Sequence, residues 1–281
     1  MAVMEKGSTR GCLEQRTTHS PCLGVTVSCF GRPRNCAIGD WEDSERFAFM
    51  ADQAQKNGVK HLWVPRPTTF NTLIASPQQF ERVWDIDDVL VHTGVMADGV
   101  ELLPNDGFSI SSGDCPTLVV VDKKSNRIIA THAGRDCLID RGEILRSRPT
   151  RNHRSVVDVI WNRLEPEDPR AIQAWVYCGI GPEGFSHDVG HPEYGEDNQT
   201  LISWLIRHYG TGVFADPQSQ GKLRLLHLIR KQFERYGVAP RQVKTDHVDT
   251  GRDLNQLTGK PAWWSRRRGD SGRNGVLVTR Q

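Results

Sequence analysis

The sequence predicts an α+β fold, a single domain of mixed β-sheets with surrounding helices. Short β-branched runs and helical segments follow one another irregularly, without the strict strand–helix alternation of a doubly wound sheet. The 281 residues, 37% hydrophobic and 25% charged, suffice to bury a sizeable core. No change of composition marks an internal boundary. We therefore expect one domain over residues 21–281, preceded by a flexible tail at residues 1–20.

Eight segments rich in β-branched and aromatic residues predict strands. Most are bounded by glycine, proline or charged residues that end regular structure. The predicted strands are Val25–Cys29, Leu62–Val64, Val89–Val91, Phe108–Ile110, Thr117–Val121, Arg127–Thr131, Ile172–Tyr177 and Val276–Thr279.

Four segments carry apolar residues three and four positions apart and predict helices. The first runs for about 14 residues between the N-cap Ser44 and the stop signal Gly58. The others are Ser155–Leu164, Asn198–Tyr209 and Gly221–Tyr236.

Neither a membrane span nor a disulfide framework is expected. The longest aliphatic run, Leu118–Val121, is far shorter than the ~20 residues that a spanning helix needs. Residues 1–16 lack the apolar stretch of a secretory signal, so we expect a cytoplasmic protein with no membrane partner. The seven cysteines are odd in number and contain no Cys-x-x-Cys pair, against a disulfide-stapled module or a zinc ribbon. We expect at least one cysteine to act as a thiol.

The net charge of +2 conceals an uneven distribution. Residues 201–281 contain 15 Lys and Arg against 6 Asp and Glu. This basic third is consistent with a solvated surface or with an anionic small molecule. No recognised RNA-binding motif accompanies it, so we do not expect nucleic acid as a partner.

A hairpin brings a cysteine near a histidine. Two apolar runs flank the polar turn at residues 123–126, which is typical of a β-hairpin. Counting outward from this turn places Cys115 opposite a residue between 131 and 135, and thus within about two positions of His132. Opposed side chains have Cβ atoms ~4.5–5.5 Å apart, close enough for a thiol and an imidazole to share a proton. A small core cysteine beside a structural histidine would give the same spacing.

Several short motifs in a fixed order resemble the bacterial laccase-domain family. This family is also called polyphenol oxidase or purine nucleoside phosphorylase and includes the peptidoglycan editing factor. The resemblance covers roughly residues 24–281. The motifs are Ala97-Asp98-Gly99-Val100, Gly113-Asp114-Cys115, His132-Ala133-Gly134, Gly181-Pro182, Val189-Gly190, Trp263-Trp264-Ser265-Arg266-Arg267-Arg268 and Gly272-Arg273, with Asn35 in a loop similar to the family's asparagine loop.

The resemblance implies the laccase-domain fold, shared distantly with the catalytic domain of cytotoxic necrotizing factor, a cysteine–histidine deamidase toxin. Members hold zinc, or copper in older descriptions, with one Cys and two His, and they phosphorolyse purine nucleosides or deaminate adenosine. Cys115 and His132 match two of those ligands. The third position falls on Thr68, which indicates a divergent member. Substitution by another histidine, His61, His92 or His187, remains open.

The sequence therefore leads to a purine nucleoside phosphorylase-type enzyme with zinc rather than copper and with phosphate as co-substrate. Cys115, His132 and Asp114 are the predicted catalytic residues, and Cys115 and His132 the predicted metal ligands. Two alternatives remain: a metal-free cysteine deamidase or amidase, and a degenerate binding protein of the same fold. The predicted residues for binding the nucleoside or phosphate are Asn35, Arg135, Arg267, Arg268 and Arg273.

Overall fold

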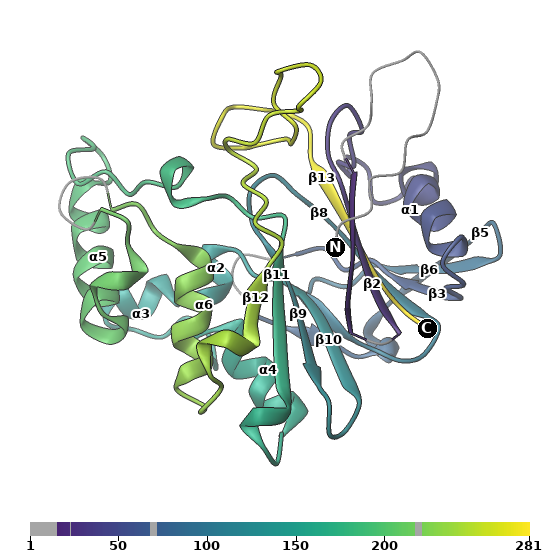
Figure 1. Ribbon diagram of the computed structural model, residues 1–281, viewed down its shortest axis with the longest axis horizontal. Helices are drawn as coiled ribbons and strands as arrows, with labels where there is room; N and C mark the ends of the chain where they lie inside the picture. The colour runs from purple at the N-terminus through teal and green to yellow at the C-terminus, as the bar shows by residue number, and fades with distance from the viewer. Residues whose placement is uncertain (1–15, 23, 68–71, 217–220) are drawn as a thin grey trace.

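The computed structural model describes residues 16–22, 24–67, 72–216 and 221–281. Within them, two β-sheets pack face to face at the centre of the molecule, and helices cover the outer face of each sheet (Figure 1). This mixed architecture confirms the predicted fold class. Thr68 lies outside the described residues.

The first sheet has seven strands in the order β1-β2-β13-β8-β3-β6-β5. Neighbouring strands in this sheet are antiparallel, except that β3 pairs in parallel with both β6 and β8. The strands are β1 (Arg16–Cys22), β2 (Val25–Phe30), β3 (His61–Trp63), β5 (Arg82–Ile86), β6 (Val89–Thr93), β8 (Asp106–Ser112) and β13 (Asn274–Arg280).

The second sheet has six strands in the order β12-β11-β9-β10-β7-β4. All six residues of β9 are buried, because this strand has the first sheet on one face and helices on the other. The strands are β4 (Ile74–Ala75), β7 (Gly99–Leu102), β9 (Thr117–Asp122), β10 (Arg127–His132), β11 (Ile172–Tyr177) and β12 (Val243–Thr245).

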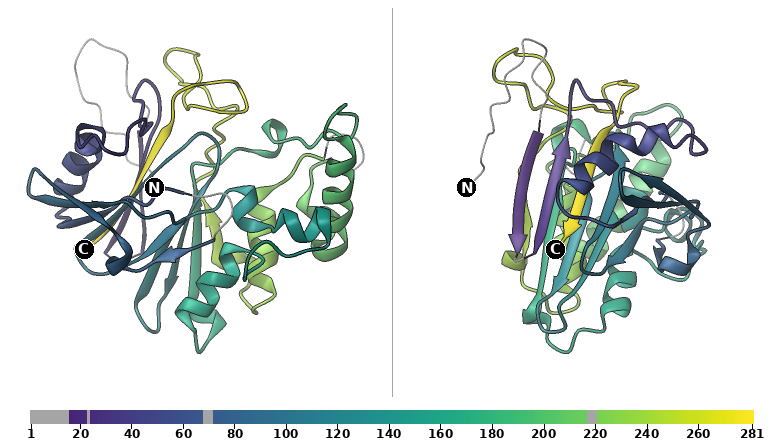
Figure 2. Two further views of the ribbon diagram at one scale, coloured as in Figure 1. Left: turned by 180° about the vertical axis from the view of Figure 1, so that it is seen from behind. Right: turned by 90° about the vertical axis from the view of Figure 1, so that its right-hand side faces the viewer.

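The helices form the two outer layers, as the views from behind and from the side also show (Figure 2). Helix α1 covers the first sheet, and α2 to α6 lie against the second. The α-helices are α1 (Glu45–Gln55), α2 (Arg135–Leu138), α3 (Arg141–Arg146), α4 (Val156–Leu164), α5 (Gly195–Tyr209) and α6 (Leu225–Glu234). Single 3₁₀ turns occur at Pro77–Gln79, Pro169–Ala171, Pro182–Gly184, Thr211–Val213 and Pro240–Gln242.

Successive side chains of β9 point to opposite faces of the second sheet and so contribute to two different cores. Leu118 and Val120 pack against the helices, whereas Val119 and Val121 pack between the two sheets. No helix in the described part of the chain has the length and apolar character needed to cross a membrane.

All eight predicted strands and all four predicted helices are present, with differences at their ends. The predicted tail at residues 1–20 is wrong for residues 16–20, which lie in β1 and pair with β2. Strand β1 alternates exposed and half-buried positions, so backbone pairing rather than an apolar face holds it at the sheet edge. Helix α6 begins at Leu225 rather than Gly221, because the N–H of Leu223 donates to the carbonyl of Phe185 at 3.0 Å.

Candidate functional site

The turn between β9 and β10 brings Cys115 and His132 together. The observed register sets His132 opposite Thr117, so its continuation sets Cys115 opposite Gly134. A Cβ atom at Gly134 would lie 2.7 Å from the Cys115 Sγ and 3.1 Å from the His132 Cε1. Only glycine leaves room for the thiol and the imidazole to meet here. The two side chains therefore lie together, as the hairpin register predicts.

Strand β7, on the other side of β10, supplies a carboxylate to the same imidazole. Gly99 pairs with Thr131, and a Cβ atom at Gly99 would lie 2.4 Å from the Cβ of Thr131. This close approach sets Asp98 beside His132, whose backbone N–H donates to the Asp98 carbonyl at 2.7 Å. The side chains also meet, with 3.2 Å between the His132 Nδ1 and the Asp98 Oδ1. His132 therefore lies between a cysteine and an aspartate.

A second cysteine completes the surroundings of His132. The Cys137 Sγ lies 3.2 Å from the His132 Nδ1 and 3.2 Å from the Asp98 Oδ1. Burial acts to lower the pKa of His132, but the sulfurs of Cys137 and Cys115 and the Asp98 carboxylate raise this pKa well above its ordinary value. Burial raises the pKa of Cys137 to about 11, so at neutral pH this residue is a thiol. His132 is thus the group that holds a proton in the site.

Asp114, predicted to be catalytic, fastens the C-terminal segment to the hairpin. Its Oδ1 accepts a hydrogen bond from the Thr250 hydroxyl at 2.9 Å, and its Oδ2 accepts one from the backbone N–H of Arg267 at 2.8 Å. The carboxylate that contacts His132 is Asp98 instead. Asp114 therefore positions Arg267 next to Cys115.

Arg135 and His187 form a second pair at this end of the fold. The buried imidazole of His187 donates from Nδ1 to the Gly221 carbonyl at 3.1 Å, and its Nε2 accepts a hydrogen bond from Arg135 Nη1 at 3.1 Å. The Arg135 Nε binds the Asp136 carboxylate at 2.8 Å. Burial and the Arg135 charge lower the pKa of His187 to about 4, so this imidazole is neutral at pH 7.

The guanidinium group of Arg267 lies over the Phe185 ring, 4.9 Å from its centroid. Partial desolvation and the nearby charge of Arg135 lower the pKa of Arg267, whereas Asp114 and Cys115 act in the opposite direction. Among the described residues, no hydrogen bond or ion pair engages this guanidinium. Arg267 thus places positive charge without an ion-pair partner near Cys115, whereas the charge of Arg135 is paired with Asp136.

The other predicted anion-binding residues are occupied in loop contacts. Arg268 donates to the Trp263 carbonyl at 2.5 Å and to other backbone oxygens. Arg273 donates to the Gly272 carbonyl at 2.8 Å, and its backbone N–H binds the Asn35 Oδ1 at 2.9 Å. Asn35 and Arg273 thus join the loop after β2 to the C-terminal segment, whereas Arg268 binds within the C-terminal segment itself.

Comparison with known proteins relates this arrangement to solved structures. No family model matches the sequence, and no curated protein matches it. The alignment with the hypothetical protein YfiH of Bacillus licheniformis covers 95% of this chain and 97% of YfiH, with 18% identity and a TM-score of 0.66. The alignment with the Neisseria meningitidis protein NMB0706, of the DUF152 family, covers 95% of this chain and 99% of that protein, with 15% identity and a TM-score of 0.60. The alignment with YlmD of Geobacillus stearothermophilus covers 98% of each chain, with 16% identity and a TM-score of 0.57.

The chain has the YfiH fold. This confirms, at the level of the fold, the resemblance to the laccase-domain family. The match spans both sheets and all described helices, since it covers nearly the full length of each chain.

The residues of this YfiH fold do not complete the metal site that the resemblance implies. That site needs a third ligand beside Cys115 and His132, at the position of Thr68. His61 and His92 bind each other in the first sheet, with 3.0 Å between Nδ1 and Nε2. Among the described residues, no group of three metal-ligating side chains includes Cys115. We therefore assign no step of the chemistry to a metal on Cys115.

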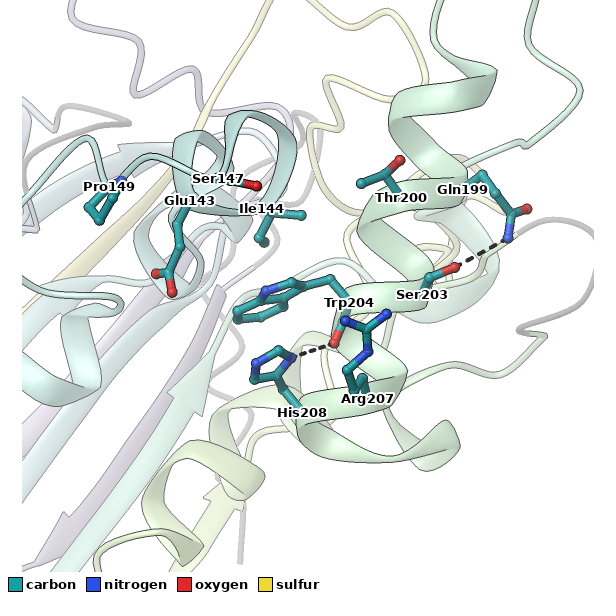
Figure 3. Close-up of a pocket in the computed structure, with 10 residues that line it drawn as sticks. All are labelled: Glu143, Ile144, Ser147, Pro149, Gln199, Thr200, Ser203, Trp204, Arg207 and His208. Atoms are coloured by element: carbon teal, nitrogen blue, oxygen red, sulfur yellow. Dashed lines mark hydrogen bonds between the residues drawn. The ribbon is translucent and has the colours of Figure 1, made fainter.

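A separate cavity of about 630 Å³ opens between α3 and α5 of the YfiH fold (Figure 3). Trp204 extends from α5 toward Ile144 of α3 and stacks on His208, with ring centroids 3.8 Å apart. None of the predicted site residues lines this cavity. It is a feature of the helical layer rather than of the Cys115 site.

Sequence reasoning missed the role of two residues at His132. Asp98 entered only as part of a motif, although its place before a glycine and a short, largely apolar segment was a usable signal for the end of a strand. Cys137, five residues after His132, has no role predicted from the sequence, because the short helix α2 that turns it back onto the imidazole has no periodic pattern. Both contacts depend on how β7 and α2 pack against β10.

Proposed function

We propose that the protein is a thiol-based hydrolase or acyl transferase that acts on an amide or ester carrying an anionic group. Cys115 is the nucleophile, His132 its base, and Asp98 the residue that orients the imidazole. The observation that carries this proposal is the 3.2 Å contact between the His132 Nδ1 and the Asp98 Oδ1, on an imidazole that Cys115 also contacts. A nucleophile that contacts a base, which in turn contacts an orienting carboxylate, is an arrangement typical of covalent catalysis.

The chemistry follows from the proton on His132. The Cys115 sulfur adds to the carbonyl carbon while His132 holds the proton that the thiol gives up. The carbon–nitrogen or carbon–oxygen bond of the substrate then breaks, and the leaving group departs with that proton. Water adds to the resulting thioester, His132 takes a proton from the water, and the carboxylic acid leaves as Cys115 is restored. Asp98 keeps the Nδ1 proton fixed throughout.

The arginine pair defines the expected substrate class. Among the described residues, the Arg267 guanidinium has no hydrogen-bond or ion-pair partner, and the nearby charge of Arg135 repels it. An anionic group on the substrate would relieve this repulsion and receive forked hydrogen bonds. His187 beside Arg135 is neutral and adds no charge of its own to this end of the site. We therefore expect a carboxylate or phosphate near the scissile bond.

Two activated esters test the proposal: 4-nitrophenyl succinate, which carries a carboxylate, and the neutral 4-nitrophenyl acetate. We expect the wild-type protein to release 4-nitrophenolate faster from the anionic ester than from the neutral one. Cys115→Ser should lose both activities, and the exposed-face variant Arg207→Gln should keep both. Equal rates for wild type and Cys115→Ser would contradict the assignment of the nucleophile.

A second candidate is phosphorolysis of a purine nucleoside, the activity implied by the laccase-domain resemblance. The guanidinium of Arg267 favours it, because this group has no hydrogen-bond or ion-pair partner among the described residues and suits a phosphate. Incubation with inosine or adenosine and phosphate should then yield free base and ribose-1-phosphate. Absence of these products, with ester hydrolysis retained, separates the two candidates.

A further inference from the structure

We infer that Asp98, His132 and Cys137 form a buried binding site for a zinc-class transition-metal ion, separate from Cys115. The three side chains come from β7, from the end of β10 and from α2. Their exposed fractions are 0%, 7% and 1%, so the site is closed to solvent. One potential ligand atom from each lies within 4.8 Å of the other two.

The spacing of the three atoms fits one metal ion. The Asp98 Oδ1, the His132 Nδ1 and the Cys137 Sγ are each 3.2 Å apart. A tetrahedral zinc ion with bonds of about 2.0–2.3 Å separates its ligand atoms by about 3.3–3.7 Å. A movement of a few tenths of an ångström would therefore admit the ion, with its fourth position on one side of the triangle.

Hydrogen bonding alone does not satisfy this group of side chains. With a proton on the His132 Nδ1 and one on the Cys137 Sγ, both groups donate to the same oxygen, Asp98 Oδ1. The Asp98 Oδ2 is then buried without any hydrogen-bond partner. A buried carboxylate oxygen that faces no donor is uncommon, and a cation bound to this carboxylate would balance the negative charge that the missing donor leaves uncompensated.

The donor set selects the class of ion. Thiolate, imidazole and carboxylate together favour zinc and similar transition metals over calcium or magnesium, which prefer oxygen. A thiolate at Cys137 and a carboxylate at Asp98 also balance the two charges of such an ion.

Occupation of this site would exclude the catalytic arrangement. The ion takes the His132 Nδ1 and the Asp98 Oδ1, which are the two atoms that the proposed triad uses to orient the base. This consequence rests on the proposed function. The metal-bound protein should then be the inactive form, with Cys115 present but without its base.

Refolding in the presence of metal tests the site without reliance on activity. The full chain is unfolded in denaturant with reductant and EDTA, then refolded with one equivalent of Zn²⁺ or Co²⁺ and desalted. We expect about one bound ion per chain in the wild type, and a thiolate-to-cobalt charge-transfer band with Co²⁺. Cys115→Ser should keep both signals, and Cys178→Ser, at a buried cysteine elsewhere, serves as the matched control.

Two variants remove ligands from different elements. Cys137→Ser should lower the metal content at least tenfold and abolish the charge-transfer band, and Asp98→Asn should lower the metal content while the band of residual Co²⁺ remains. Far-ultraviolet circular dichroism verifies that each variant is folded. Metal-free wild type after refolding, a Cys137→Ser variant with an unchanged band, or loss of metal in Cys115→Ser would each overturn the inference. Ester hydrolysis by the metal-free wild type reports separately on the proposed function.

Discussion

The two ends of the site use a buried histidine in opposite ways. His132 lies beside Asp98 and two cysteine sulfurs, and its pKa is raised well above the ordinary value. His187 is equally buried but lies beside Arg135 and Arg267, and its pKa is lowered to about 4. Burial acts to lower both pKa values, so the neighbouring charges decide the difference.

In the proposed mechanism, the two ends of the site therefore have different roles. The His132 end is anionic and holds a proton, as a general base and acid must. The His187 end contains Arg135, paired with Asp136, and Arg267, whose guanidinium is open to the anionic part of a substrate. Cys115 lies between them, within electrostatic range of both His132 and Arg267. A single substitution at either end should therefore affect one role and spare the other.

Asp98→Asn should produce the largest effect, because it removes the negative charge that orients and stabilises the His132 imidazolium. We expect hydrolysis of 4-nitrophenyl succinate to fall by about 10²–10⁴-fold in kcat, with little change in KM. The pKa of His132, followed by NMR of its ring protons, should also fall. Wild-type kcat combined with an unchanged His132 titration would show that Asp98 does not orient the base.

His187→Gln should change the dependence of stability on pH. Folded His187 stays neutral down to about pH 4, whereas in the unfolded chain it binds a proton below about pH 6.5. The unfolded state therefore takes up more protons on acidification, and the wild type should lose about 3 kcal/mol of unfolding free energy between pH 6.5 and 4 from this group.

Urea unfolding at several pH values measures this effect. The Gln variant keeps a neutral hydrogen-bonding side chain, so its loss between pH 6.5 and 4 should be smaller by about that amount. At pH 7.5, where His187 is uncharged in both states, the protonation of this residue contributes no difference. Parallel pH profiles for the two proteins would show that His187 is protonated in the folded state.

The sequence was informative where contacts are local. The hairpin around residues 123–126 fixes the Cys115–His132 register within twenty residues of chain, and apolar periodicity marks α1 and α6. Strands of two to five residues, such as β4, β5 and β7, and the single turn of α2 carry too few residues to show a period.

The rest of the site depends on contacts between distant segments. Asp98 reaches His132 through the pairing of β7 with β10, 34 residues apart in the chain. Arg267 reaches Cys115 because Asp114 binds its backbone across 153 residues. Composition also misled about the arginines: the basic third is real, but Arg268 donates to backbone carbonyls and the Asp270 carboxylate, and Arg273 donates to backbone carbonyls. Which arginine is free is settled by packing rather than by charge count.

Arg267→Gln gives the smallest expected effect, and it tests the cationic end directly. Iodoacetate and iodoacetamide alkylate the same sulfur and differ in charge, so the ratio of their rates at Cys115 reports the local potential. We expect the variant to lower the iodoacetate-to-iodoacetamide ratio about fivefold, a modest value because the guanidinium is partly solvated. The wild-type ratio should also fall as salt is added.

Arg207→Gln on α5 is the matched control, since it removes the same charge far along the chain from Cys115 and should leave the ratio unchanged. Peptide mapping after alkylation confirms that the modified residue is Cys115 rather than another half-buried cysteine such as Cys22 or Cys36. A similar fall in both variants would assign the preference to net charge alone. An unchanged ratio in Arg267→Gln would instead remove this residue from the substrate site, while the His132 end would still stand on its contacts with Asp98.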